Sequence, residues 1–240
     1  MTKPHSNNDH CSPTLPPQYV LAPPTLAFRR TQFPATTKKS MSRTQTRLHD
    51  LALSSFRRKH NTTTFYLLRA ANLYFRALYP SSFDPHFTHT LDAIGLEALV
   101  WGDPSHAERC FRASLTERKR TLPLGHWMIT ESTVHLAQAL GVQGRLNEAE
   151  ELLRWSVAWH AERRGSQHKE SREVMWLLAR LLEETGRCGE ALGLYEECYV
   201  GALGAVGEHH VDTREYWGDY MRLVARREDA EVVVSDAGTI

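Results

Sequence analysis

The sequence predicts an all-α protein, a right-handed α-α superhelix of about three to four helix pairs that follows a disordered N-terminal tail. Three observations support this fold class. Chemically similar residues recur at intervals of 42 residues. Within each interval the apolar residues follow the spacing of amphipathic helices. The first 60 residues also differ in charge and composition from the rest of the chain.

Residues 1–42 are predicted to form a disordered, basic tail rich in Pro, Ser and Thr. Residues 1–60 hold ten Lys and Arg against Asp9 and Asp50, so the remaining residues hold 19 against 26 and the body is acidic. A segment with many prolines and hydroxyl residues buries too little apolar surface to offset the entropy lost on ordering. The tail and the body therefore carry opposite charge, and only the body is expected to fold.

Residues 43–85 are predicted to form a degenerate helix pair. Leu51, Ala52 and Ser55 share one helical face in the first half of this segment. Ala70, Tyr74 and Ala77 share another in the second half. The end units of a stacked array are expected to be atypical, because one of their faces has no neighbouring unit to cover it.

Residues 86–227 contain the regular repeats, each with matched residues 42 positions apart. The first half of each unit carries three columns: Ile94, Leu136 and Leu178; Gly95, Ala137 and Ala179; Ala98, Leu140 and Leu182. The second half carries four: Gly102, Gly144 and Gly186; Ala107, Ala149 and Ala191; Phe111, Leu153 and Tyr195; Ser114, Ser156 and Cys198. Because both halves have helical spacing, each unit is predicted to be two helices joined by a tight turn.

The small residues explain how the two helices of a unit can pack closely. A glycine such as Gly144 can close the first helix in the left-handed conformation without a Cβ penalty. The small residue at Gly95 is expected to face Ala107, twelve positions later, and the equivalent pairs behave alike. The larger side chain in the Phe111 column is then expected to fill the space toward the next unit.

This pattern resembles the tetratricopeptide repeat (TPR), as the order of Gly95, Ala107, Phe111 and Ser114 shows. The 42-residue period is longer than the usual 34 and resembles the kinesin-light-chain subtype. The linker histidines His126, His168 and His210 recur at the same spacing. The resemblance implies a TPR solenoid whose first helices line a concave groove for a protein or peptide partner.

One feature of the kinesin-light-chain group is missing. In that group an Asn commonly stands just before the Leu-Ala pair and helps to hold a bound peptide, whereas this chain has Ala93, His135 and Leu177. Other residues of the first helices must therefore supply the groove. The predicted groove residues are Val134, Gln138, Trp176, Arg180 and Arg222, with Asp92 and Leu96 at equivalent positions.

Tryptophan placement follows from the same register. Trp176 precedes the Leu178-Ala179 pair by two positions, which favours the inner side of the superhelix. A core position for Trp176 stays open as well, because large rings are mostly buried. The other tryptophans considered are expected to pack in the core or between repeats: Trp101, Trp155 and Trp217.

No catalytic, cofactor-binding or metal-binding residues are predicted. The sequence contains no phosphate-binding glycine loop, no G-x-S-x-G and no H-E-x-x-H. The neighbouring His209 and His210 point in different directions, and no cysteine completes a metal site with them at the usual spacings. Acid pairs such as Glu183-Glu184 are expected on solvated helix faces. The protein is therefore expected to be no enzyme and to bind neither a cofactor nor a small-molecule substrate.

The leading functional hypothesis is a non-catalytic adaptor or scaffold that binds a partner segment in the concave groove. The alternative is binding of nucleic acid or an acidic surface through the basic N-terminal arm. The acidic repeat body argues against nucleic acid on the repeats, since phosphate contacts need clustered Lys and Arg. Self-association through an uncapped end of the array stays open.

Localisation is expected to be cytoplasmic. No apolar stretch approaches the roughly 18 residues that a bilayer span needs. Four cysteines lie far apart without a C-x-x-C pair, which is typical of reduced thiols. Targeting to an organelle through the N-terminal tail is the alternative, because the tail is poor in acidic residues and contains Arg, Ser and Thr. Residues 228–240 are treated as a C-terminal tail.

Overall fold

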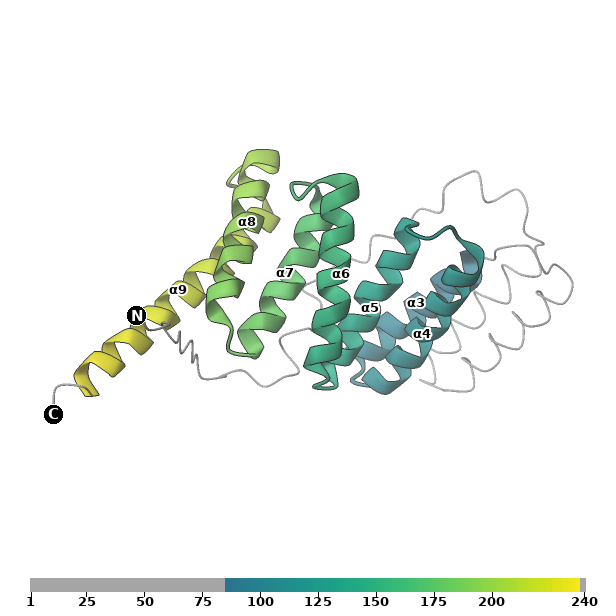
Figure 1. Ribbon diagram of the computed structural model, residues 1–240, viewed down its shortest axis with the longest axis horizontal. Coiled ribbons are helices and arrows are strands. Elements are labelled where there is room, and N and C mark those ends of the chain that lie inside the picture. Colours follow the sequence, from purple (N-terminus) through teal and green to yellow (C-terminus); the bar gives the residue numbers. More distant parts are fainter. Residues whose placement is uncertain (1–84, 238–240) are drawn as a thin grey trace, which may run out of the picture. The chain divides into compact units, whose positions relative to one another are not determined.

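The computed structural model describes residues 85–237, which form seven α-helices and no strand (Figure 1). The all-α prediction is therefore confirmed for this part of the chain. The tail predicted at 1–42 lies outside the described residues, and so does the helix pair predicted at 43–85 apart from Pro85.

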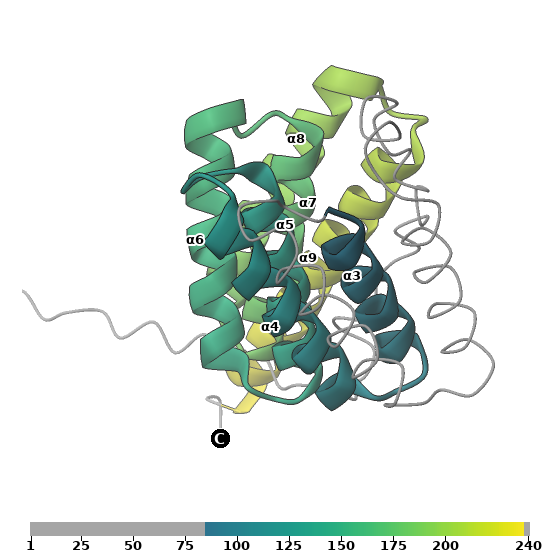
Figure 2. The same cartoon turned by 90° about the vertical axis from the view of Figure 1, so that its right-hand side faces the viewer.

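The helices divide into two compact units, and the boundary along the chain falls between Gln143 and Gly144. The first unit contains α3 (Pro85–Val100), α4 (Pro104–Thr121) and α5 (Trp127–Val142). The second contains α6 (Leu146–Arg164), α7 (Lys169–Glu184), α8 (Cys188–Val206) and α9 (Val211–Ala237). Within each unit consecutive helices lie side by side, as Figures 1 and 2 show. The last helix, α9, continues to Ala237 and so enters the predicted tail at 228–240.

The first helix of a pair ends at the predicted glycine. Gly102 and Gly186 adopt positive φ angles of 76° and 77°. The following residue then donates a backbone hydrogen bond five positions back, from Asp103 N to Ala98 O at 2.9 Å and from Arg187 N to Leu182 O at 2.9 Å. This left-handed C-terminal cap turns the chain sharply into the second helix.

The linker histidines mark where the first helices begin. His126 Nδ1 accepts a hydrogen bond from Met128 N at 3.3 Å, and His210 Nδ1 accepts one from Asp212 N at 3.2 Å. Both therefore satisfy a backbone N–H that has no partner inside the helix. His168 occupies the same N-cap position, and its Nδ1 contacts the Glu170 carboxylate instead.

The core of each unit follows the small-residue columns. In the first unit Gly95 lies under the ring of Phe111, which also lies 5.3 Å from the His135 ring of the next helix. In the second unit Ala179 and Ala191 are both fully buried. The prediction that small residues allow close helix packing is therefore consistent with the packing inside each unit.

The column of Ser114 and Cys198 holds small buried donors. Ser114 Oγ donates to Thr88 O at 3.3 Å, and Cys198 Sγ donates to Arg172 O at 3.3 Å, so both reach back by the same number of residues. Burial raises the pKa of the Cys198 thiol. These hydrogen bonds therefore link the second helix of a repeat to the first helix of the same repeat, α4 to α3 and α8 to α7.

Candidate functional site

Trp176 belongs to α7 of the second unit, and its side chain contacts α9. Its indole Nε1 donates to Asp219 Oδ2 at 2.8 Å, and its ring centroid lies 6.3 Å from that of Tyr216. Only 6% of the residue is exposed. The indole is therefore held in place by α9. The residue whose side chain stacks on its ring is more exposed than Trp176 itself.

That residue is Arg180, one turn later on α7. Its guanidinium carbon lies 4.7 Å from the centroid of the Trp176 ring, within the range of a cation–π contact. Arg180 is half-buried. Two predicted groove residues thus form one aromatic and cationic pair on the first helix of a repeat.

The third predicted residue of this unit, Arg222, belongs to an ion-pair network. Its Nη2 lies 3.1 Å from Glu183 Oε2 and 2.9 Å from Asp219 Oδ1. Glu183 also accepts from Arg226 Nη1 at 2.8 Å and from the Tyr195 hydroxyl at 3.1 Å. The expectation that Glu183 lies on a solvated face is wrong, because only 9% of its side chain is exposed.

Sequence reasoning missed these contacts between α7 and α9, although a signal for them was present. Several polar pairs join residues 43 positions apart, which is one repeat plus one residue. They are Lys169 with Asp212, Trp176 with Asp219, and Glu183 with Arg226. Once the repeat length is known, opposite charges at this spacing predict contacts between successive first helices. We call Trp176, Arg180, Glu184, Asp219 and Arg222 the α7–α9 face.

Glu184 lies beside Arg180, and its carboxyl has a perturbed pKa. Burial raises the pKa of Glu184 to about 7, and the neighbouring Glu183 adds to this, while Arg180 acts in the opposite direction. The α7–α9 face therefore contains a carboxyl that changes its charge near neutral pH.

This pKa makes stability depend on pH. Between about pH 4.5 and 7 the folded protein holds a proton on Glu184 that the unfolded chain releases, so this group's contribution to stability falls as the pH rises through that window. The Glu184→Gln variant removes the effect. We expect it to raise the melting temperature near pH 8 relative to the wild type, and to change it little near pH 4.5. Thermal unfolding across this range measures the difference. The Glu162→Gln variant, on the exposed surface of α6, is the control, and an equal shift at every pH would contradict the assignment.

The groove residues predicted in the first unit lie on α3 and α5. Val134 and Leu96 are half-buried, whereas Gln138 is 1% exposed and neither atom of its amide has a hydrogen-bond partner among the described residues. Asp92 is 5% exposed and pairs with Arg118. Because the predicted groove residues come from both units, the groove as a whole stays a prediction.

Arg118 of α4 is a fully buried cation that joins the three helices of the first unit. Its Nη2 lies 2.7 Å from Asp92 Oδ2 of α3, and its Nη1 lies 3.1 Å from Glu131 Oε2 of α5. Nη1 also donates to Met128 O and Ser132 Oγ, each at 2.7 Å. Two carboxylates and two neutral acceptors thus replace the water that the guanidinium loses on burial.

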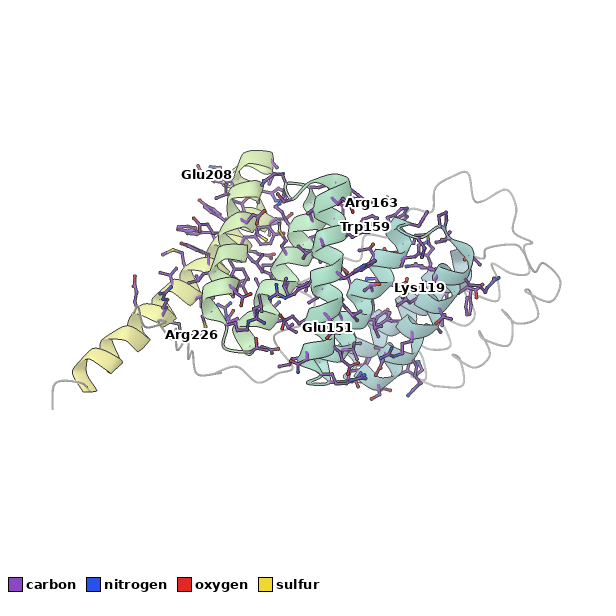
Figure 3. All side chains as sticks on the ribbon, in the orientation of Figure 1. Lys119, Glu151, Trp159, Arg163, Glu208 and Arg226 are labelled. Carbon is purple, nitrogen blue, oxygen red and sulfur yellow. The ribbon has the colours of Figure 1, made fainter. Side chains whose placement is uncertain are left out.

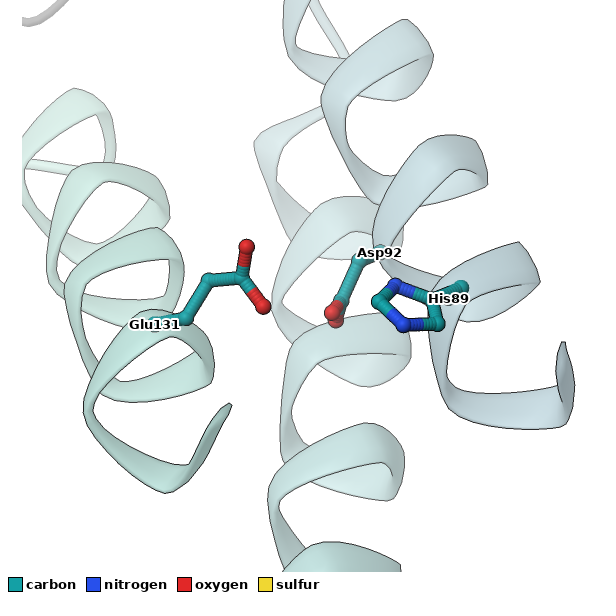
Figure 4. A group of neighbouring side chains, drawn as sticks. All are labelled: His89, Asp92 and Glu131. Atoms are coloured by element: carbon teal, nitrogen blue, oxygen red, sulfur yellow. The ribbon is translucent and has the colours of Figure 1, made fainter. Parts of the chain in front are cut away.

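The same two carboxylates and His89 could in principle hold a metal ion. Figure 4 shows His89, Asp92 and Glu131 pointing toward one another, and one ligand atom from each lies within 4.8 Å of the others. Arg118 already supplies a positive charge to both carboxylates. Burial raises the pKa of Asp92, and Arg118 opposes that change. We therefore interpret the group as a buried ion-pair network.

This network could not be predicted from the repeat pattern, because its central residue has no equivalent in the other repeats. His160 and Ala202 stand one and two periods after Arg118. Without a matched column, Arg118 has the appearance of an ordinary basic residue near the end of an amphipathic helix. Only the packing of three helices shows that it is buried.

Comparisons with known proteins agree with this fold. Residues 129–199 match the model of the tetratricopeptide repeat family. No curated protein matches the sequence. In the part of the chain that the structure describes, no helix has the length and apolar character needed to cross a membrane.

Solved structures show the same type of solenoid. A Podosopora anserina protein of kinesin-light-chain type with nearly identical TPR-like repeats matches with a TM-score of 0.59 and 20% identity, over 78% of this chain and 89% of that one. A variant of it matches with a TM-score of 0.59 and 21% identity, over 79% and 90%. BtubC from P. vanneervenii matches with a TM-score of 0.58 and 17% identity, over 76% of this chain and 68% of that one. The expected TPR solenoid fold is confirmed.

Proposed function

We propose that this TPR protein is a non-catalytic scaffold that binds a segment of a partner protein on its first helices, with the α7–α9 face as a principal contact. Tetratricopeptide repeats generally serve as protein–protein interaction scaffolds, and residues 129–199 match that repeat. A site on the first helices agrees with the way such solenoids present an extended surface.

The observation that carries the proposal is the stack of Arg180 on Trp176. Aromatic residues and Arg are the types that most often dominate binding energy at protein interfaces. Here Asp219 fixes the ring through a hydrogen bond, and the half-buried guanidinium of Arg180 stacks on it. A partner segment could contact a pre-positioned cation without ordering it first.

The α7–α9 face carries both positively and negatively charged groups. It therefore suits a partner segment whose side chains carry charges of both signs. Arg180 and Arg222 contribute positive charge, while Asp219 and Glu184 contribute carboxyl groups. Because Glu184 is partly protonated near pH 7, a basic side chain of the partner would stabilise its ionised form. Binding of such a segment should therefore strengthen as the pH rises through about 7.

The chemistry of the other candidate groups supports a non-catalytic role. Burial raises the pKa of the Cys110 and Cys198 thiols, which disfavours the thiolate that a nucleophile needs. Burial also lowers the pKa of His106 and His160. All four residues are at most 7% exposed, so their side chains are shielded from solvent.

The test is affinity purification with the full chain as bait. The Arg180→Glu variant should lower recovery of the bound partner about tenfold or more, since it reverses the charge of the stacked cation. Arg163→Glu is the matched control, because Arg163 lies 5.6 Å from the Trp159 ring centroid and forms the same kind of stack on the second helix α6 (Figure 3). It should leave recovery unchanged.

A further bait that lacks residues 1–42 separates the face from the basic arm. Full recovery by this shortened chain supports binding on the repeats. Recovery that survives Arg180→Glu in a folded protein but disappears with the arm would refute the proposal and favour binding through the tail. Thermal unfolding of each variant shows whether it is folded.

A further inference from the structure

The outer side of α9 carries an apolar stripe that no described helix covers. Tyr220, Met221 and Val224 stand 42 residues after Leu178, Ala179 and Leu182 of α7. Those three α7 residues are at most 2% exposed in the unit where α8 packs against α7. In α9 the equivalent Met221 is 42% exposed. The equivalent side of α7 is covered by the second helix of its pair. The stripe on α9 is therefore a helix-packing surface that no described helix covers.

Aromatic side chains extend this stripe onto α8. Trp217 is 43% exposed, and its ring centroid lies 4.7 Å from Tyr199 of α8 and 5.8 Å from Tyr220. One turn after Tyr199, Leu203 is 39% exposed. We call Tyr199, Leu203, Trp217, Tyr220 and Met221 the apolar end face. Exposed apolar groups that form one cluster across two helices are typical of an interaction surface.

The end face is not shaped for another helix pair of the same kind. The column that holds Gly95, Ala137 and Ala179 has Met221 in α9. A small residue at this position lets the second helix of a unit approach closely, as the buried Ala179 and Ala191 of α7 and α8 illustrate. A methionine keeps an incoming helix at a distance, and its flexible side chain adapts to surfaces of irregular shape.

The charges at the margins of the end face are self-complementary. Glu196 precedes Tyr199 by one turn of α8, and Arg214 precedes Trp217 by one turn of α9. Both are exposed, and neither has an ion-pair partner within residues 85–237. Because α8 and α9 run in opposite directions, the two charges lie at opposite ends of the face. A two-fold axis would bring each charge to the opposite charge of a second copy.

We propose that the apolar end face is the interface of a symmetric homodimer, in which a second copy of this chain covers the stripe. The aromatic residues of the two copies bury one another at the centre, with Glu196 of each copy beside Arg214 of the other at the edges. An isologous contact of this kind is closed, so the expected assembly is a dimer and not a filament.

Sedimentation velocity of the purified full chain tests the proposal. Over roughly 1 to 100 μM the wild type should pass from monomer toward dimer. Trp217→Glu places a charge at the centre of the face and should raise the dimer dissociation constant about tenfold or more. Trp155→Glu is the matched control, because Trp155 is 46% exposed on α6 of the same unit and should leave the dissociation constant unchanged.

The marginal charges provide a second test that does not depend on the aromatic core. Glu196→Arg and Arg214→Glu should each weaken the dimer, and the double variant should recover it, since the exchanged charges again face opposite signs. Met221→Glu replaces Trp217→Glu if the latter variant does not fold.

Four outcomes overturn the proposal. They are a monomer at every concentration, open-ended assembly, a dimer that survives Trp217→Glu in a folded protein, and a dimer lost equally in Trp155→Glu. A monomer throughout would instead favour a helix from another protein, or from a longer form of this chain, as the occupant of the stripe.

Discussion

Replacing Arg118 by Met is expected to lower the free energy of unfolding by about 3 to 5 kcal/mol. The methionine keeps most of the side-chain volume but leaves Asp92 and Glu131 without the buried cation that both contact. Removing one partner of a buried ion pair is costly because the remaining charge stays without compensation. Urea-induced unfolding monitored by circular dichroism measures the change.

The matched control is Arg112→Met on the same helix. Arg112 is exposed and, within the described part of the chain, pairs only with Glu108 at i−4, a contact worth a few tenths of a kcal/mol. If both variants lose the same stability, Arg118 is not buried as the structure shows. Adding Asp92→Asn to Arg118→Met should recover part of the loss, because it removes the negative charge left in the core.

The second large effect is expected at Gly95, where Ala should destabilise the protein by about 1 to 3 kcal/mol. A Cβ atom at this position would lie 2.5 Å from Cε1 of Phe111, which is far inside van der Waals contact. The gain in helix propensity from Gly to Ala, about 1 kcal/mol, is too small to offset this overlap. Thermal unfolding of Gly95→Ala measures the loss.

A second helical glycine supplies the opposite expectation. Gly193 of α8 has no atom within 4 Å of the position of a Cβ, so Gly193→Ala should stabilise by about 0.5 to 1 kcal/mol. Adding Phe111→Leu to Gly95→Ala should relieve the overlap, since the next repeat uses Leu in the Phe111 column together with Ala in the Gly95 column. A neutral Gly95→Ala would show that the repeat register is wrong.

The helix pairs could be predicted because their determinants recur in the sequence. The glycines at Gly102 and Gly186 adopt the expected left-handed conformation, and the recurring linker histidines His126 and His210 lie where helices begin. Each of these features depends on local backbone geometry. A periodic sequence repeats that local information several times, so it can be recognised without knowledge of tertiary packing.

The candidate site was harder to predict, because its contacts join residues that are unique to one repeat. Trp176 and Arg180 are one turn apart on α7, but the hydrogen bond from Trp176 to Asp219 and the burial of Glu183 depend on α9. Arg118 has no repeat equivalent, and its burial depends on three helices together.

The remaining tryptophans show where residue type misled the prediction. Trp101, Trp155 and Trp217 were expected in the core or between repeats, whereas they are 61%, 46% and 43% exposed. Large apolar side chains are buried on average, but an end face or a second-helix surface can present them to solvent. Exposure of Trp217 therefore reflects its position on α9, where no described helix follows.

The packing of each helix against its neighbours along the chain also bears on how the protein is made. Within a unit, contacts join helices that are adjacent in sequence or separated by one helix, so only short loops must close before native contacts form. Topologies of this type fold quickly. During synthesis, α3 and α4 can pair as soon as both have left the ribosome, before the residues of α9 have been translated. Among the described helices the apolar end face is then completed last, which shortens the time for which an unfinished chain exposes it to other nascent proteins.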